Sequence, residues 1–204
     1  MPTYQPLSPG ELVARIAERV LSRAERTVVA VDGADAADPE SLAAALVSRL
    51  RDAGRDAAPV PLHGYVRPAS LRLEYGRDDT DSYRYSWFDY AALDREVLRA
   101  LRERGRWLPA LWDEAADRSA RAALRSASDG TVLVVAGPML LGRGFTFDAT
   151  VRLELSEPAL RRRTPDDQRW TVPALLAHAE EYPEEPDFAV RWDHPSRPAL
   201  RISA

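Results

Sequence analysis

The chain has 204 residues, a length that is typical of one domain with a single hydrophobic core. Its formal net charge of −4 argues against a nucleic-acid binder, because neutralising phosphates requires a clustered surplus of cations. Cysteine is absent, which excludes disulfides, thiolate nucleophiles and soft metal sites.

The basic side chains are of one type: all 28 are arginine, and the chain has no lysine. This excludes a Schiff-base lysine, a lysine general base and a lysine that reaches a nucleotide phosphate. Codon bias in a GC-rich bacterial genome is the simplest cause. The chemical consequence holds whatever the cause.

The N-terminal residues 1–12 contain neither a basic nor an apolar segment, so they do not resemble a signal peptide. The longest apolar stretch, residues 131–142, is interrupted by Gly137 and Pro138 and is shorter than the ~18 residues that a membrane span needs. We therefore expect a cytoplasmic protein that does not bind membranes.

The first predicted helix starts at Ser8, which can act as its N-cap. Pro9 occupies the first helical position and Glu11 completes a capping box. Apolar residues then recur at helical spacing up to about Arg26. Residues 27–31 (TVVAV) follow and are typical of a fully buried strand.

Strands and helices alternate along the rest of the chain. Gly54 is the expected C-terminal stop of the second helix, and Asp89 can cap the third. The further predicted elements are a helix at 38–53, an extended segment at 57–62, a helix from 89 to about 104, strands at 131–136 and 150–155, a helix at 175–181 and a strand at 188–192. This order predicts an α/β fold with a mainly parallel sheet and helices on both faces, in three layers.

The loop between the first buried strand and the next helix lies where phosphates bind in sheets of this kind, because the helix start offers unpaired amides. It reads Asp32-Gly33-Ala-Asp-Ala-Ala-Asp38-Pro39-Glu40-Ser41. The loop resembles the phosphate loop of the uridine kinase family of P-loop nucleoside kinases, in which Asp-Gly leads through a glycine-rich stretch to Gly-Lys-Ser/Thr. The resemblance implies a P-loop kinase-like fold.

Three positions depart from the family pattern. Asp38 falls on the last glycine, Pro39 on the lysine and Glu40 on the hydroxyl residue that would hold magnesium. An incoming phosphate would meet like charge, at a cost of about 3 kcal/mol per pair at ~6 Å. Asp38-Pro39-Glu40 is also a good helix start by itself, so an ordinary capped helix with no history of phosphate binding is the alternative.

The resemblance continues beyond this loop and covers about residues 26–202. Its motifs are individually weak, but their order and spacing match the family. They are His63-Gly-Tyr65-Val-Arg67-Pro68, Gly76-Arg77, Tyr83 through Trp87-Phe88-Asp89-Tyr90 to Leu93, Ala136-Gly137, Phe147-Asp148, Arg161-Arg162-Arg163 and Pro186-Asp187-Phe188 with Asp193-His194-Pro195 and Pro198. We therefore expect one uridine-kinase-like domain over residues 1–204, with an N-terminal helix at 1–26, a core at 27–202 and a short lid near 158–170.

The resemblance also implies site residues. His63 falls on the acidic position that supplies the family's catalytic base, so it is a candidate base, although a lone histidine is more often structural. Tyr65, Arg67, Arg77, Tyr83 and Asp89 would bind a nucleoside-like substrate, or else pack a loop on the sheet. The lid residues Arg161, Arg162 and Arg163 could bind an anion, or form a solvated face.

These observations favour a degenerate uridine-kinase-like protein that lacks ATP-dependent phosphotransfer and serves as a small-molecule-binding or interaction module. The alternatives are an enzyme that uses the retained pocket for other chemistry, and a weak nucleoside kinase. We expect no cofactor, no metal and no or weak Mg-ATP binding. The expected ligand is nucleoside-like, and a protein partner or a second copy of the chain stays open.

Overall fold

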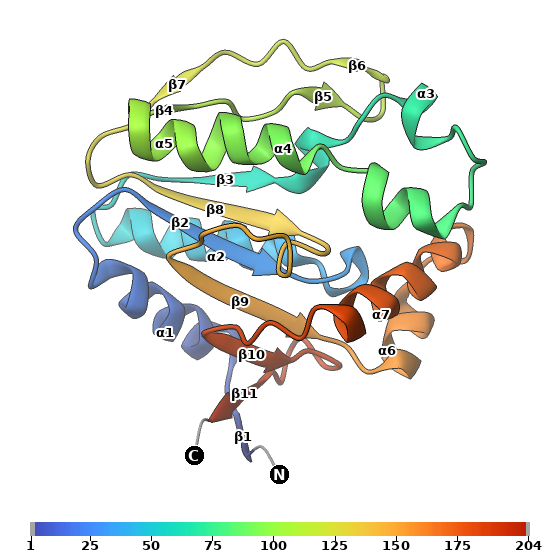
Figure 1. Cartoon of the computed structure of the whole chain (residues 1–204). Helices are drawn as coiled ribbons and strands as arrows, with labels where there is room; N and C mark the ends of the chain where they lie inside the picture. The colour runs from blue at the N-terminus through green and yellow to red at the C-terminus, as the bar shows by residue number, and fades with distance from the viewer. Residues whose placement is uncertain (1–2, 203–204) are drawn as a thin grey trace.

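The computed structural model describes residues 3–202 and contains one seven-stranded sheet, in the order β1-β11-β10-β9-β2-β8-β3 (Figure 1). Its strands are β1 Thr3–Pro6, β2 Thr27–Asp32, β3 Ala57–Pro61, β8 Val132–Gly137, β9 Ala149–Glu154, β10 Phe188–Arg191 and β11 Ala199–Ile202. The five strands from β3 to β10 are parallel, and β11 and β1 extend the sheet in antiparallel pairing. This is the mainly parallel α/β sheet that the sequence predicts.

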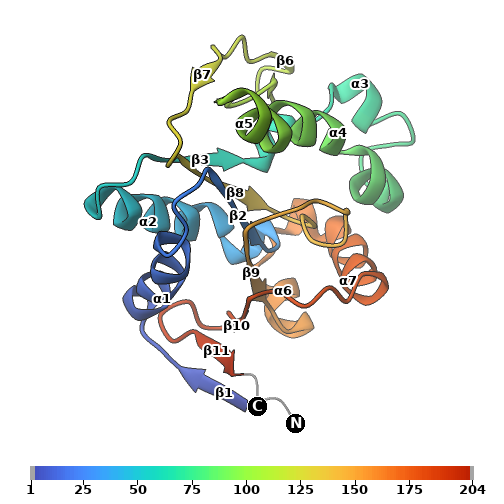
Figure 2. The same ribbon diagram turned by 60° about the vertical axis from the view of Figure 1, so that its left-hand side comes forward.

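Successive side chains of the buried strands point to opposite faces of the sheet, so the protein has two hydrophobic cores. On β2, Val29 and Val31 face the core that α1 and α2 cover, whereas Val28 and Ala30 face the core that α4, α5 and α7 cover. Figure 2 shows these two groups of helices on opposite sides of the sheet. The helices are α1 Pro9–Leu21, α2 Pro39–Asp52, α3 Ala69–Arg72, α4 Tyr90–Leu93, α5 Arg99–Arg104, α6 Glu157–Arg163 and α7 Val172–Glu181.

The N-terminal segment differs from the expectation of a helix over residues 1–26. Strand β1 precedes the helix, and α1 ends at Leu21. The hydroxyl of Ser22 donates to the carbonyl of Arg19, and the chain then turns into β2. The start is as predicted, because Ser8 and Glu11 form the complete capping box.

Asp89 caps the helical segment that reaches Arg104, as predicted, by accepting from the amide of Ala92 at 2.9 Å. This segment contains a π-helical turn, Asp94–Leu98, between α4 and α5. Strand β4 Arg106–Trp107 then pairs in antiparallel fashion with β7 Arg125–Ser126, and between them β5 Trp112–Asp113 forms a short hairpin with β6 Arg118–Ser119. They lie above α4 and α5 in Figure 1. None of the helices formed by residues 3–202 combines the length and the apolar run that a bilayer crossing needs.

Candidate functional site

The carboxyl ends of β2, β3, β8 and β9 meet at one edge of the sheet, which is where open parallel α/β sheets bind ligands. The residues after β2 form a short 3-10 turn, Asp35–Ala37, and then enter α2. The residues after β3 form another turn, Leu62–Tyr65, which carries His63. The two turns place the loop after β2 beside His63.

The start of α2 is closed by its own side chain. Asp38 has a left-handed backbone (φ 55°), and its carboxylate accepts from the Ser41 amide at 3.1 Å and from the Ser41 hydroxyl at 2.6 Å. Pro39 supplies no amide hydrogen. Glu40 lies beside this cap, and its pKa is raised by burial and by the nearby carboxylates of Asp35 and Asp38, against an opposing effect of His63.

The amides of the loop are also engaged within the protein. The Gly33 amide donates to the carbonyl of Gly137, the Ala37 amide to that of Ala34, and the Asp38 amide to that of Asp35. The indole of Trp192 donates to the carbonyl of Ala37 at 2.7 Å from the other side. The amides of Gly33, Ala37 and Asp38 are therefore not available to an incoming anion.

Asp32, at the end of β2, is a buried structural group. Its carboxylate accepts from the amide of Leu140 at 2.9 Å and from Arg152 at 3.2 Å. Burial raises the pKa of Asp32, and Arg152 opposes that change. Gly33 follows where a Cβ atom would lie 3.0 Å from Leu153, so the close packing of loop and sheet favours glycine.

His63 bridges two carboxylates. Its Nδ1 lies 2.8 Å from Glu114 Oε2, and its Nε2 lies 3.1 Å from Asp35 Oδ1. Burial alone would lower the pKa of His63, but the hydrogen bonds and charges of the two carboxylates outweigh it and raise the pKa to about 10. At neutral pH the ring is therefore an imidazolium that donates on both sides, with its edge packed against Phe88 at 5.4 Å. Such a ring has no lone pair with which to accept a proton.

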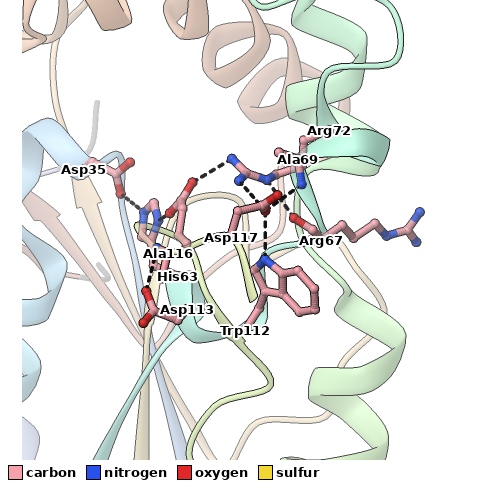
Figure 3. Close-up of polar contacts among 10 residues, drawn as sticks. Asp35, His63, Arg67, Ala69, Arg72, Trp112, Asp113, Ala116 and Asp117 are labelled. Carbon is pink, nitrogen blue, oxygen red and sulfur yellow. Dashed lines mark hydrogen bonds and ion pairs between the residues drawn. The ribbon is translucent and has the colours of Figure 1, made fainter. Parts of the chain in front are cut away.

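The bridge belongs to a longer chain of alternating charges, which we call the ion-pair chain: Asp35, His63, Glu114, Arg72 and Asp117 (Figure 3). Arg72 is buried and lies 2.9 Å from Glu114 and 3.7 Å from Asp117. The ion-pair chain connects the loop after β2, the turn after β3, helix α3 and the β5–β6 hairpin. Such a network fixes these segments relative to one another.

Further contacts secure the far end of the ion-pair chain. Asp117 accepts from the amide of Ala69 at 2.8 Å and from the indole of Trp112 at 3.0 Å. Arg72 donates to the carbonyl of Arg67 at 2.7 Å. The Arg67 side chain itself points away from the network in Figure 3.

The other predicted substrate-binding residues lie in different surroundings. The Tyr65 hydroxyl is used in a hydrogen bond to the carbonyl of Leu108, and Tyr83 packs among Trp87, Phe88 and Trp170. Arg77 is exposed on the connection after α3. Four cavities within residues 3–202 are lined by residues other than Tyr65, Arg67, Arg77, Tyr83 and Asp89. Their role in binding stays a prediction.

The predicted lid arginines lie on α6 and face in different directions. Arg161 pairs with Glu157 at 2.7 Å, and Arg163 donates to the carbonyl of Trp192 at 3.1 Å. Arg162 is exposed. Among residues 3–202 no group of three or more histidine, aspartate or glutamate side chains is arranged to hold a metal ion.

Sequence reasoning found His63 and the loop but missed Glu114, Arg72 and Asp117. Glu114 lies 51 positions from His63 and 42 positions from Arg72. No local periodicity or spacing marks such partners, because only the tertiary fold brings them together. Clustering of charge beside Trp112 is the one signal in the sequence, and it does not name the partner.

Comparisons with known proteins support the class of fold. A possible uridine kinase from Bacillus stearothermophilus has a similar structure, with a TM-score of 0.72, 18% identity, and coverage of 88% of this chain and 97% of that one. A proposed fructose transport system kinase from Silicibacter sp. TM1040 has a TM-score of 0.61 and 23% identity, covering 85% and 89%. The YGR205w protein has a TM-score of 0.62 and 8% identity, covering 97% and 100%.

No protein-family model matches the sequence, and neither does any curated protein. At these identities the structural likeness establishes the fold alone. The fold is that of the P-loop kinases: a mostly parallel seven-stranded sheet flanked by helices.

Proposed function

We propose that this chain is a P-loop-kinase-fold protein that does not carry out ATP-dependent phosphotransfer and acts as a binding module. The observation that carries this proposal is the closed start of α2, where Asp38 takes the place of an anion at the Ser41 amide. Phosphoryl transfer requires a phosphate cradle, a metal site and a group that orients the nucleophile. The residues at the phosphate cradle and at the position of the orienting group argue against two of these requirements.

Both charge and geometry argue against phosphate binding at the loop after β2. Asp35, Asp38 and Glu40 place carboxylates where phosphates would be bound, and the chain offers no lysine to neutralise them. Arg152 reaches the first residue of the loop, but its guanidinium is paired with Asp32 at 3.2 Å. The nearest cation to Asp35 is His63, and its two ring nitrogens are already engaged by Asp35 and Glu114.

The protonation of His63 argues against its use as a general base. A general base must accept a proton from the attacking hydroxyl, and it works best with a pKa near the operating pH. With a pKa of about 10, His63 is protonated at neutral pH and serves instead as the cation of the ion-pair chain. The alternative of a weak nucleoside kinase therefore has no base at this position.

A phosphotransfer assay tests the proposal. Purified protein is incubated with Mg-ATP and each common nucleoside or ketohexose, and nucleotide or sugar-phosphate formation is followed by mass spectrometry. We expect no product above the rate without protein. Transfer that depends on the protein and is lost in the Asp38→Ala variant would refute the proposal, because it would show that the loop takes part in catalysis.

A further inference from the structure

A second feature lies on the α7 side of the sheet and borders the start of the loop after β2 at Asp32, Gly33 and Ala34. It is a cavity of about 360 Å³, which we call the α7 cavity, and it lies between the end of β9, helices α6 and α7, and the segment 183–186. Its volume falls within the range of small-molecule sites. Leu153, Leu160, Leu175 and Leu176 contribute apolar walls.

The charges around the α7 cavity do not balance. Its lining includes four carboxylates, from Asp32, Glu154, Glu184 and Glu185, but only two guanidinium groups. Each arginine already has a carboxylate: Arg152 pairs with Asp32 at 3.2 Å, and Arg201 pairs with Glu185. His178 also lines the cavity and is neutral, since burial lowers its pKa to about 4.

Two carboxylates are left over. Within residues 3–202, neither Glu154 nor Glu184 has a basic side chain at ion-pair distance. Glu154 accepts only a long hydrogen bond of 3.5 Å from Tyr4, and Glu184 accepts from the amide of Gly142 at 2.6 Å. Arg191 is the neighbour of Glu154 in the sheet, but its guanidinium lies over the Tyr4 ring at 3.8 Å.

We infer that the α7 cavity binds a small molecule with an apolar body and one protonated amine. The leucine walls would bury the apolar body, and the unpaired carboxylates would attract the ammonium group and repel an anion. The inference deepens the proposed binding role by naming a ligand class and a place. The lining includes Asp32, Gly33 and Ala34 at the start of the loop but excludes Asp38, Glu40 and His63, so the inference rests on the carboxylates of Glu154 and Glu184 and not on the Asp38 cap.

Three probes of similar shape and different charge test the inference: 2-phenylethylamine, 2-phenylethanol and 3-phenylpropanoate. Binding is measured by calorimetry at neutral pH and low salt. We expect the amine to bind most tightly, and roughly tenfold more tightly than the carboxylate, with a difference that shrinks in high salt. No binding of the amine, or equal binding of all three probes, would overturn the inference.

Two substitutions in the α7 cavity and one control substitution outside it test where the probes bind. Glu154→Gln should weaken amine binding severalfold and leave the alcohol unchanged, whereas Glu180→Gln, at an exposed position of α7 outside the cavity, should change neither. Leu176→Trp should abolish binding of all probes by filling the cavity, with circular dichroism confirming the fold. Amine binding that survives both Glu154→Gln and Leu176→Trp would contradict the site. Failure here would leave the absence of phosphotransfer untouched, because these titrations contain no nucleotide.

Discussion

His63 is the residue whose protonation most affects the site. Because its folded-state pKa of about 10 lies above the ordinary value of 6.5, the imidazolium stabilises the folded protein. That stabilisation is fully present below about pH 6.5, and it is lost as the pH rises through about 10. The ion-pair chain should therefore weaken at alkaline pH.

The His63→Gln variant tests this protonation. We expect the free energy of unfolding to fall by about 1–2 kcal/mol at pH 6, a value reduced for the partial exposure of the ring, and by less at pH 9.5. Urea denaturation at the two pH values measures the difference. His194→Gln, at an exposed position, is the matched control and should leave stability unchanged. A loss that is equal at both pH values would contradict a charged His63.

Asp38 is the second decisive residue, because its carboxylate caps the start of α2. Replacing it with alanine removes the cap. Alanine keeps a Cβ atom, which is unfavourable at φ 55°, and has no side chain that can form a compensating hydrogen bond. We expect Asp38→Ala to lower stability by about 1–2 kcal/mol, and Asp38→Gly to lower it by less. Thermal and urea denaturation compare them.

The control for Asp38 lies at the opposite end of the same helix. Asp52 is exposed at the C-terminus of α2, where a carboxylate faces the negative end of the helix dipole. Asp52→Ala should leave stability unchanged or raise it slightly. Equal losses from Asp38→Ala and Asp52→Ala would show that Asp38 is not a specific cap.

At the scale of elements, β8 and the turn after β3 approach closely at Gly137. Its φ is +156°, and an added Cβ atom would lie 2.4 Å from Leu62 Cβ. We expect Gly137→Ala to destabilise the protein by about 1–3 kcal/mol, and to disturb His63 because it adjoins Leu62. Gly10→Ala is the control: nothing lies within 4 Å, and α1 should become slightly more stable.

The elements differ in how far the sequence predicts them. The α1 capping box, the continuous apolar runs of β2 and β8, and the Asp89 cap are local signals, and the structure confirms each. Strands β1 and β11 were missed because they are only four residues long and half exposed, so their pairing is set by the sheet rather than by an apolar pattern. The ion-pair chain was missed because its contacts are long-range.

The candidate site also contains features that depend on local sequence and features that depend on long-range contacts. The Asp38 cap could be predicted because the carboxylate and its amide lie three positions apart. The protonation state of His63 could not be predicted, because an isolated histidine titrates near neutrality and it is Asp35 and Glu114 that raise its pKa. The burial of Tyr83 among other aromatic rings is likewise a property of the folded chain.

For the whole molecule, the ion-pair chain connects the loop after β2 to the β5–β6 hairpin, so breaking its centre should loosen both ends. Arg72 is buried and holds Glu114 and Asp117. Arg72→Met should cost roughly 1–3 kcal/mol, because it removes the buried cation that Glu114 and Asp117 share, although His63 still compensates Glu114. Hydrogen exchange should then rise at the β5–β6 hairpin and the turn after β3 and stay constant at β10. Unchanged exchange would show that the network does not couple these segments.

Calorimetric titration of the unmodified protein with Mg-ATP tests the central claim most directly. The closed start of α2, the carboxylates of Asp35, Asp38 and Glu40, and the absence of lysine predict no measurable heat of binding at millimolar nucleotide. A saturable isotherm with a micromolar dissociation constant would contradict the claim, because it would show that the loop opens to accept a triphosphate.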